Sequence, residues 1–204
     1  FRGSEERGTA GQLGHATDFT DEQYLNLLRD VQNLEHKIQQ TIEVLDFFSD
    51  GRKDVGIAID EWGPWYTDTG PGLYQQNTLR DGILAALVFN LLNRYSRKVK
   101  MSNIAQSVNV LGTLCLTKGD ETVLTPTYHV YHMFRQHMGN TAIAVDVQSP
   151  VLWEPPPGKP SQQPEREPKP MHSVDASASM SRDGGTIVIT LVNLSPTEEQ
   201  QAEL

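Results

Sequence analysis

The apolar positions in the first quarter of the chain recur at helical spacing. Between residues 24 and 48 the large apolar side chains stand three or four positions apart, as on one face of an amphipathic helix or of two consecutive helices: Tyr24, Leu27, Leu28, Val31, Leu34, Ile38, Ile42, Leu45 and Phe48. The preceding Thr20-Asp-Glu-Gln23 has the composition of a capping box. The pattern therefore predicts helix from about residue 20 to Gly51, and the Gly-rich residues 1–18 are predicted to form a loop, with order beginning at Phe19.

Two short predicted strands alternate with further helical patterns. Residues 55–59 are apolar and bounded by charged residues, which is typical of a strand buried on both faces in a parallel sheet, and residues 99–104 are predicted as another buried strand. Between them, Asn77 is predicted to cap a second helix, and a third helix is predicted at about residues 128–138, ended by Gly139. The order helix, strand, helix, strand is that of an α/β barrel or a doubly wound sheet.

The composition changes near residue 150. Eight of the twelve prolines lie between residues 150 and 170, so we expect an extended loop there without a packed element. Beyond it, residues 174–179 and 186–192 flank an Asp-Gly-Gly turn and predict an antiparallel hairpin. Together with residues 142–147 this hairpin would supply part of a β-sandwich, which we expect to be completed by chain absent here, because two short strands do not fold alone.

Charge and composition narrow the class of ligand. Seventeen basic against twenty-six acidic side chains give a net charge of −9, which argues against nucleic acid and favours a sugar or another neutral small molecule. No apolar stretch approaches the roughly 18 residues of a membrane-spanning helix. A single cysteine, Cys115, excludes an intrachain disulfide and favours a reducing, cytoplasmic compartment. His129 and His132 would share a helix face but lack the pattern of a metalloprotease site, so neither a metal nor another cofactor is expected.

The carboxylate of Glu61 is the strongest candidate for chemistry. It lies at the carboxyl end of a predicted strand, where the active-site groups of a barrel are found, although a solvated strand-end acid is the simpler interpretation. Trp62 and Trp65 follow it, with a Gly-Pro bend between them. A carboxylate beside aromatic rings, which pack against the apolar face of a sugar, is typical of a sugar-binding site. Alternation along a strand would turn Asp60 toward the opposite face, so a second catalytic carboxylate is expected from another strand.

Four ordered segments resemble one known family. They are GIAIDEWGPWY (56–66), LYQQNTLRD (73–81), VKMSNIAQSVNV (99–110) and LTPTYHVY (124–131). Together they are similar to the α-L-arabinofuranosidases of glycoside hydrolase family 51, strongly over residues 16–148 and more loosely over 173–195.

The resemblance implies the C-terminal portion of a (β/α)8 barrel over residues 1–138, followed by part of an all-β sandwich over residues 139–204. It implies removal of terminal α-L-arabinofuranosyl groups from arabinan, arabinoxylan or their oligosaccharides with retention, with Glu61 matching the family's nucleophile on strand seven. Gln106 matches a glutamine after strand eight that binds the sugar. The alternative is that its amide only forms hydrogen bonds to the backbone at the rim of the barrel. Trp65 matches a lining aromatic, and core packing is the alternative for Trp62 and Trp65. The resemblance is also compatible with a homo-oligomer of the full-length protein.

One departure from the family pattern limits the prediction. The family's acid/base is a glutamate directly after asparagine, and no Asn-Glu dipeptide occurs in the 204 residues. We therefore expect this chain by itself to be inactive and only marginally folded. Two alternatives stay open: another retaining barrel glycosidase, and an inactive carbohydrate-binding remnant.

Overall fold

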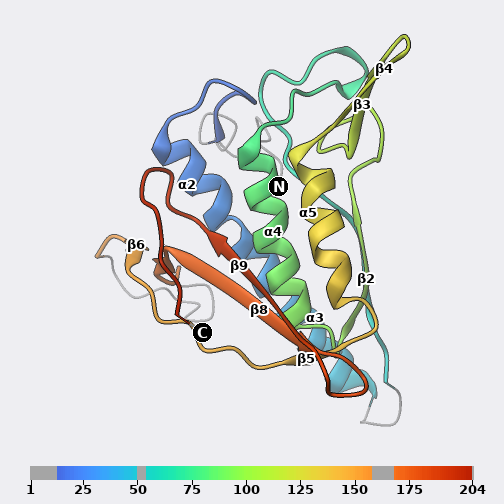
Figure 1. Ribbon diagram of the computed structural model, residues 1–204, viewed down its shortest axis with the longest axis vertical. Helices are drawn as coiled ribbons and strands as arrows, with labels where there is room; N and C mark the ends of the chain where they lie inside the picture. The colour runs from blue at the N-terminus through green and yellow to red at the C-terminus, as the bar shows by residue number, and fades with distance from the viewer. Residues whose placement is uncertain (1–12, 50–53, 158–167, 204) are drawn as a thin grey trace.

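The computed structural model describes residues 13–49, 54–157 and 168–203, which form a mixed α/β structure (Figure 1). Its elements, in chain order, are α2 (Asp21–Arg29), α3 (Val31–Ser49), β1 (Ile57–Trp62), the 3₁₀ turn η2 (Pro71–Leu73), α4 (Leu79–Arg94), β2 (Val99–Ile104), β3 (Cys115–Lys118), β4 (Glu121–Leu124), α5 (Pro126–Phe134), the 3₁₀ turn η3 (Arg135–His137), β5 (Thr141–Ile143), β6 (Val151–Trp153), β7 (Met171–His172), β8 (Val174–Met180) and β9 (Ile187–Asn193).

The first predicted helix is confirmed as two helices that meet at Asp30. The capping box is present, since Thr20 Oγ1 accepts from the Gln23 N–H at 3.2 Å and Gln23 Oε1 accepts from the Thr20 N–H at 2.9 Å. Gly51, the predicted end, lies outside the described residues. The prediction that order begins at Phe19 is wrong, because Leu13 and Ala16 are already buried against the rest of the chain.

The two predicted parallel strands are confirmed as neighbours. β1 pairs with β2 in parallel, and α4 connects them as a crossover helix (Figure 1). β2 has the predicted bounds, whereas β1 begins two residues later than predicted and runs on through Trp62. Burial on both faces is not observed: Ile57 and Ile59 pack against the core, but Ala58 and Met101 are exposed.

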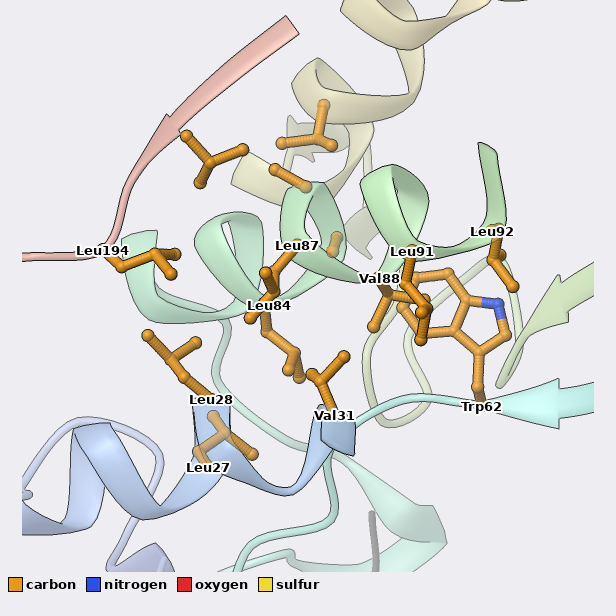
Figure 2. Packing of buried hydrophobic residues seen from close by; sticks show 14 of the residues in the cluster. Leu27, Leu28, Val31, Trp62, Leu84, Leu87, Val88, Leu91, Leu92 and Leu194 are labelled. Carbon is orange, nitrogen blue, oxygen red and sulfur yellow. The ribbon is translucent and has the colours of Figure 1, made fainter. Parts of the chain in front are cut away.

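Helix α4 occupies the centre of the structure. Its apolar residues pack on one side against Leu27 and Leu28 of α2 and Val31 of α3, and on another against Trp62 (Figure 2). Its N-cap is Thr78, whose N–H donates to the Asp81 carboxylate at 2.7 Å. The prediction of Asn77 as the cap is therefore wrong by one residue.

The predicted C-terminal hairpin is confirmed. β8 pairs with β9 in antiparallel register, and β5 adds a third strand that is shorter than predicted. Val188 and Val192 of β9 face α4, while Ile187, Ile189 and Leu191 on the other face are exposed by 57%, 40% and 45%.

The Pro-rich segment contains a strand that the sequence did not predict. β6 pairs with β7, and the ring of Trp153 lies 3.6 Å from the guanidinium carbon of Arg29 in α2. The expectation of no packed element between residues 150 and 170 is therefore wrong at this end, and residues 158–167 lie outside the described chain.

The third predicted helix is confirmed with different bounds. α5 begins at Pro126, two residues early, and gives way to η3 after Phe134. Gly139 adopts a φ of +78°, as expected for a helix-ending glycine. The hairpin β3–β4, turning at Gly119 with a φ of +60°, was not predicted.

Candidate functional site

The carboxyl ends of β1 and β2 bring Glu61 and Gln106 to the same edge of the sheet. Trp62 stands opposite Ile104 in the parallel register, and the Ala105 N–H donates to the Trp62 carbonyl at 2.6 Å. The ladder therefore continues to the residue before Gln106. Both Glu61 and Gln106 are exposed, so both polar side chains are open to a ligand from outside.

A bulge in β1 changes the expected relation between Asp60 and Glu61. Two residues separate Ile59 from Trp62, but only one separates their partners Ser102 and Ile104 on β2. The extra residue interrupts the strict alternation of faces. Asp60 is exposed like Glu61, so strict alternation, on which the prediction of opposite faces for the two carboxylates was based, does not hold at this end of β1.

The structure places Trp62 in the core. Its side chain is 5% exposed and meets the ring of Phe89 edge to face, with centroids 5.7 Å apart. Figure 2 shows the indole beside Val88, Leu91 and Leu92 of α4. Its Nε1 has no hydrogen-bond partner among the described residues. The Trp62 side chain thus packs on the core side of β1, while Glu61 is exposed.

The segment that carries Trp65 is held by a buried amide. Trp65 is half-buried, and the peptide groups on both sides of it bind Gln75. The Tyr66 N–H donates to Gln75 Oε1 at 2.9 Å, and Gln75 Nε2 donates to the Pro64 carbonyl at 3.2 Å. Gln75 is a site-supporting residue that the sequence analysis missed.

Two loops meet above the strand ends. One follows β1 (63–78) and the other follows β2 (105–114). The Leu111 N–H donates to the Leu73 carbonyl at 3.0 Å, and the Leu111 carbonyl accepts from Asn77 Nδ2 at 3.0 Å. Asn77, predicted as a helix cap, instead links the two loops.

Backbone strain concentrates in the same two loops. All the non-glycine residues with positive φ in the described chain lie there: Leu73 (60°), Gln106 (63°), Asn109 (59°) and Leu111 (49°). Such conformations cost roughly 1–3 kcal/mol each and persist where the surrounding structure enforces them, which is frequent at ligand sites.

A buried charged cluster anchors the loop after β1. The guanidinium carbon of Arg80 lies 3.7 Å from the Phe19 ring centroid and 4.1 Å from that of Tyr66, and its nitrogens donate to the carbonyls of Leu13 and His15. The Tyr66 hydroxyl donates to Asp81 Oδ1 at 3.1 Å. Burial raises the pKa of the Asp81 carboxyl, against the lowering effect of its hydrogen bond from the Thr78 N–H. Burial also raises the pKa of Tyr66 well above its usual value.

The sequence contained a signal for this cluster. Thr78-Leu-Arg-Asp81 has the spacing of a capping box, which would have placed Asp81 in the first turn of α4. No local pattern indicates that Arg80 is buried, because its partners are carbonyls more than 60 positions away.

Two other kinds of site are absent from the described residues. In residues 13–49, 54–157 and 168–203, no group of three or more His, Cys, Asp or Glu could hold a metal ion, and no helix is long and apolar enough to cross a membrane. A cavity of about 300 Å³ lies between α2, α3, α4 and β8, with Arg94 in its wall. Leu87 and Leu91 of α4 also line this cavity, and neither Glu61 nor Gln106 does.

Comparison with known proteins agrees with the four resembling segments. Residues 60–203 match the family described as Alpha-L-arabinofuranosidase C-terminal domain. An intracellular exo-alpha-L-arabinofuranosidase of Bacteroides ovatus is 35% identical over 95% of this chain and 36% of its own length. A probable alpha-L-arabinofuranosidase C of Aspergillus niger is 31% identical over 68% of the chain and 27% of its own length.

Solved structures give the same picture. The glycoside hydrolase family 51 arabinofuranosidase of Xanthomonas axonopodis pv. citri superposes with a TM-score of 0.77 and 31% identity, over 91% of this chain and 36% of that one. An α-L-arabinofuranosidase of Thermotoga maritima in complex with arabinose gives a TM-score of 0.68 and 27% identity, over 86% of this chain and 36% of that one. The chain thus spans about a third of the length of these relatives.

Proposed function

Because this chain belongs to the α-L-arabinofuranosidases of glycoside hydrolase family 51, we propose that it supplies the nucleophile-bearing part of a retaining arabinofuranosidase. The observation that carries the proposal is the position of Glu61 and Gln106 at the ends of adjacent parallel strands, inside the segment that matches the family. Trp65 completes the site as a half-buried aromatic on the adjoining loop.

The chemistry proposed for Glu61 is nucleophilic. Its carboxylate attacks the anomeric carbon of a terminal α-L-arabinofuranosyl group, and the bond to the leaving oxygen breaks as a proton reaches that oxygen. Water then hydrolyses the glycosyl ester, so that the configuration is retained. Gln106 donates a hydrogen bond to the sugar through its amide, and Trp65 covers the apolar face of the ring.

The proton donor must come from outside these residues. Retaining glycosidases hold their two carboxyl groups about 5–5.5 Å apart on different strands. No Asn-Glu dipeptide of the expected acid/base type occurs in the chain. The activity we propose therefore belongs to a polypeptide that also contains that glutamate.

The proposed setting follows from the same family membership. We assign residues 1–138 to part of a (β/α)8 barrel, with β1 and β2 as its last two strands, and residues 139–204 to part of a β-sandwich. The proposed substrates are arabinose-containing oligosaccharides and polysaccharides, supported by the arabinose in the Thermotoga maritima structure. We propose a cytoplasmic location because the similar Bacteroides ovatus protein is an intracellular enzyme.

The decisive experiment joins this chain to the part of the Bacteroides ovatus relative that precedes the matched region. Glu61→Ala should lower the turnover of an aryl arabinofuranoside by about 10⁴-fold or more. Added azide should restore turnover and yield a glycosyl azide of inverted configuration, because azide enters the face that the carboxylate vacates.

The adjacent carboxylate provides the control. Asp60→Ala removes an exposed acid one position away and should gain nothing from azide. If Glu61→Ala keeps substantial activity without added azide, Glu61 is not the nucleophile. Binding of arabinose by the joined polypeptide without any turnover would favour the carbohydrate-binding alternative.

A further inference from the structure

The amide of Gln75 is buried beneath the loop that follows β1. The residue is 2% exposed. Besides the Tyr66 N–H, its Oε1 accepts from the Thr69 hydroxyl at 2.9 Å, and its Nε2 donates to the Pro64 carbonyl at 3.2 Å. Both ends of the side-chain amide are therefore engaged, and every partner belongs to the same loop.

These hydrogen bonds bracket Trp65. The Pro64 carbonyl belongs to the peptide group that precedes the Trp65 Cα, and the Tyr66 N–H belongs to the one that follows it. Each peptide group is planar, so the orientation of the two planes defines φ and ψ of the residue between them. One rigid amide bound to both planes therefore fixes the backbone of Trp65 and the direction in which its indole leaves the chain.

We call the two hydrogen bonds of the Gln75 amide, with the Tyr66 N–H and the Pro64 carbonyl, the clamp. The clamp is itself anchored to the core. The Tyr66 hydroxyl donates to the buried Asp81 carboxylate, and the single proton of the Thr69 hydroxyl is shared between Gln75 Oε1 at 2.9 Å and the Tyr66 carbonyl at 2.8 Å. Because Asp81 lies in the first turn of α4, the loop is connected to the core through a chain of hydrogen bonds. The position of Gln75 relative to Trp65 is thus set by the central helix.

The neighbouring glutamine shows that this role is specific to one position. Gln76 is exposed, and its Nε2 donates only to the Asn77 carbonyl at 3.3 Å among the contacts of the described chain. Two glutamines of identical chemistry therefore stand side by side, one in the clamp and one outside it.

We propose that Gln75 is a positioning residue for sugar binding, which holds the indole of Trp65 against the arabinofuranosyl ring through the backbone on either side. The proposal rests on the proposed function, and it adds a residue that acts without touching the sugar. Gln75 is expected to affect the binding of the sugar ring more than the chemical step, because Trp65 contacts the ring equally before and during bond cleavage.

The first measurement uses the joined polypeptide described above and needs no activity. Hydrogen exchange at the Tyr66 amide should accelerate at least about tenfold in Gln75→Ala, because that N–H loses its acceptor. Gln76→Ala should leave the exchange rate unchanged. Equal exchange in wild type and Gln75→Ala would overturn the clamp itself.

The second measurement uses the joined polypeptide described above. In Gln75→Ala, KM for an aryl arabinofuranoside should rise about tenfold with kcat within about threefold of wild type, the pattern of lost uniform binding. Gln76→Ala should match wild type in both constants. A changed exchange rate with unchanged KM would show that Gln75 stabilises the loop without serving the sugar, which overturns the proposal.

A conservative variant supplies a readout that a loss of stability would not give. Gln75→Glu keeps the acceptor for the Tyr66 N–H, but its ionised carboxylate cannot donate to the Pro64 carbonyl; the protonated acid can. The KM ratio between Gln75→Glu and wild type should therefore fall toward one as the pH is lowered. A constant ratio would contradict the donor role of Gln75.

Absence of turnover and of arabinose binding in the wild-type polypeptide would instead refute the proposed function, while the exchange measurement still decides whether the clamp exists.

Discussion

At position 106 a glutamine occupies a backbone conformation that glycine adopts most easily, with a φ of +63°. Gln106→Gly should raise the free energy of unfolding by about 0.5–1 kcal/mol, because relief of left-handed strain exceeds the added chain entropy. Gln106→Ala keeps the strain and should change stability little. Both should lower kcat/KM in the joined polypeptide by the equivalent of about 1–3 kcal/mol, since both lose the amide. If the glycine variant is more stable and fully active, Gln106 has no role in sugar binding.

At the same scale, His137 makes stability depend on pH. Its Nδ1 lies 2.7 Å from Ser179 Oγ and its Nε2 lies 3.3 Å from Thr190 Oγ1, and burial lowers the pKa of its imidazole. A lowered pKa means that the folded chain binds the proton less readily than the unfolded chain. The contribution of His137 to the free energy of unfolding is therefore fully present above the unfolded-state pKa of about 6.5, and it is lost as the pH falls through the folded-state pKa.

Urea unfolding at several pH values tests this prediction. His137→Gln should flatten the fall in the free energy of unfolding between about pH 7.5 and pH 5. His132→Gln, on the adjoining helix, controls for the removal of a histidine and should retain the wild-type slope. An unchanged slope in His137→Gln would assign the pH dependence to other groups.

At the scale of elements, a fully buried asparagine of α4 helps to join this helix to the C-terminal sheet, together with Asn93, whose Nδ2 donates to Ser177 Oγ at 2.9 Å. Asn90 is fully buried, and its Oδ1 accepts from Ser177 Oγ and from Thr190 Oγ1, both at 2.8 Å. Asn90→Ala should cost about 1–3 kcal/mol of unfolding free energy, because it leaves buried hydroxyls short of an acceptor. Asn93→Ala, one turn along and half-buried, should cost less. Equal losses, measured by urea unfolding, would show that Asn90 Oδ1 has no special role.

At the scale of the whole molecule, one apolar sheet face is open. The outer face of β9 exposes Ile187, Ile189 and Leu191, by 57%, 40% and 45%. Contiguous apolar surface of this kind marks a site of interaction or aggregation. We therefore expect the 204-residue chain to bind a hydrophobic dye and to release no arabinose from arabinoxylan.

The source of the dye signal can be located by substitution. Ile189→Thr with Leu191→Thr should reduce dye fluorescence while preserving the circular dichroism spectrum, because threonine keeps the strand propensity. Val188→Thr with Val192→Thr, on the face toward α4, should instead destabilise the fold. Multiple turnover of natural arabinoxylan by the isolated chain would contradict the prediction of inactivity and require an acid/base within these residues.

Features whose signals are local could be predicted from the amino-acid sequence alone. The capping box at Thr20 and the turn after β8 are set by hydrogen bonds within a few positions, and the four family segments are contiguous. These parts were predicted correctly because the interactions that form them lie in the same stretch of chain.

Features that depend on distant partners became evident only in the folded chain. The bulge between Ile59 and Trp62 arises from pairing with β2, and Arg80 is buried because carbonyls near residue 13 meet it across the fold. Gln75 and Gln76 are identical in sequence terms, yet packing of the loop on α4 buries one and exposes the other. Burial and register are properties of the assembled surfaces, so a one-dimensional pattern does not contain them.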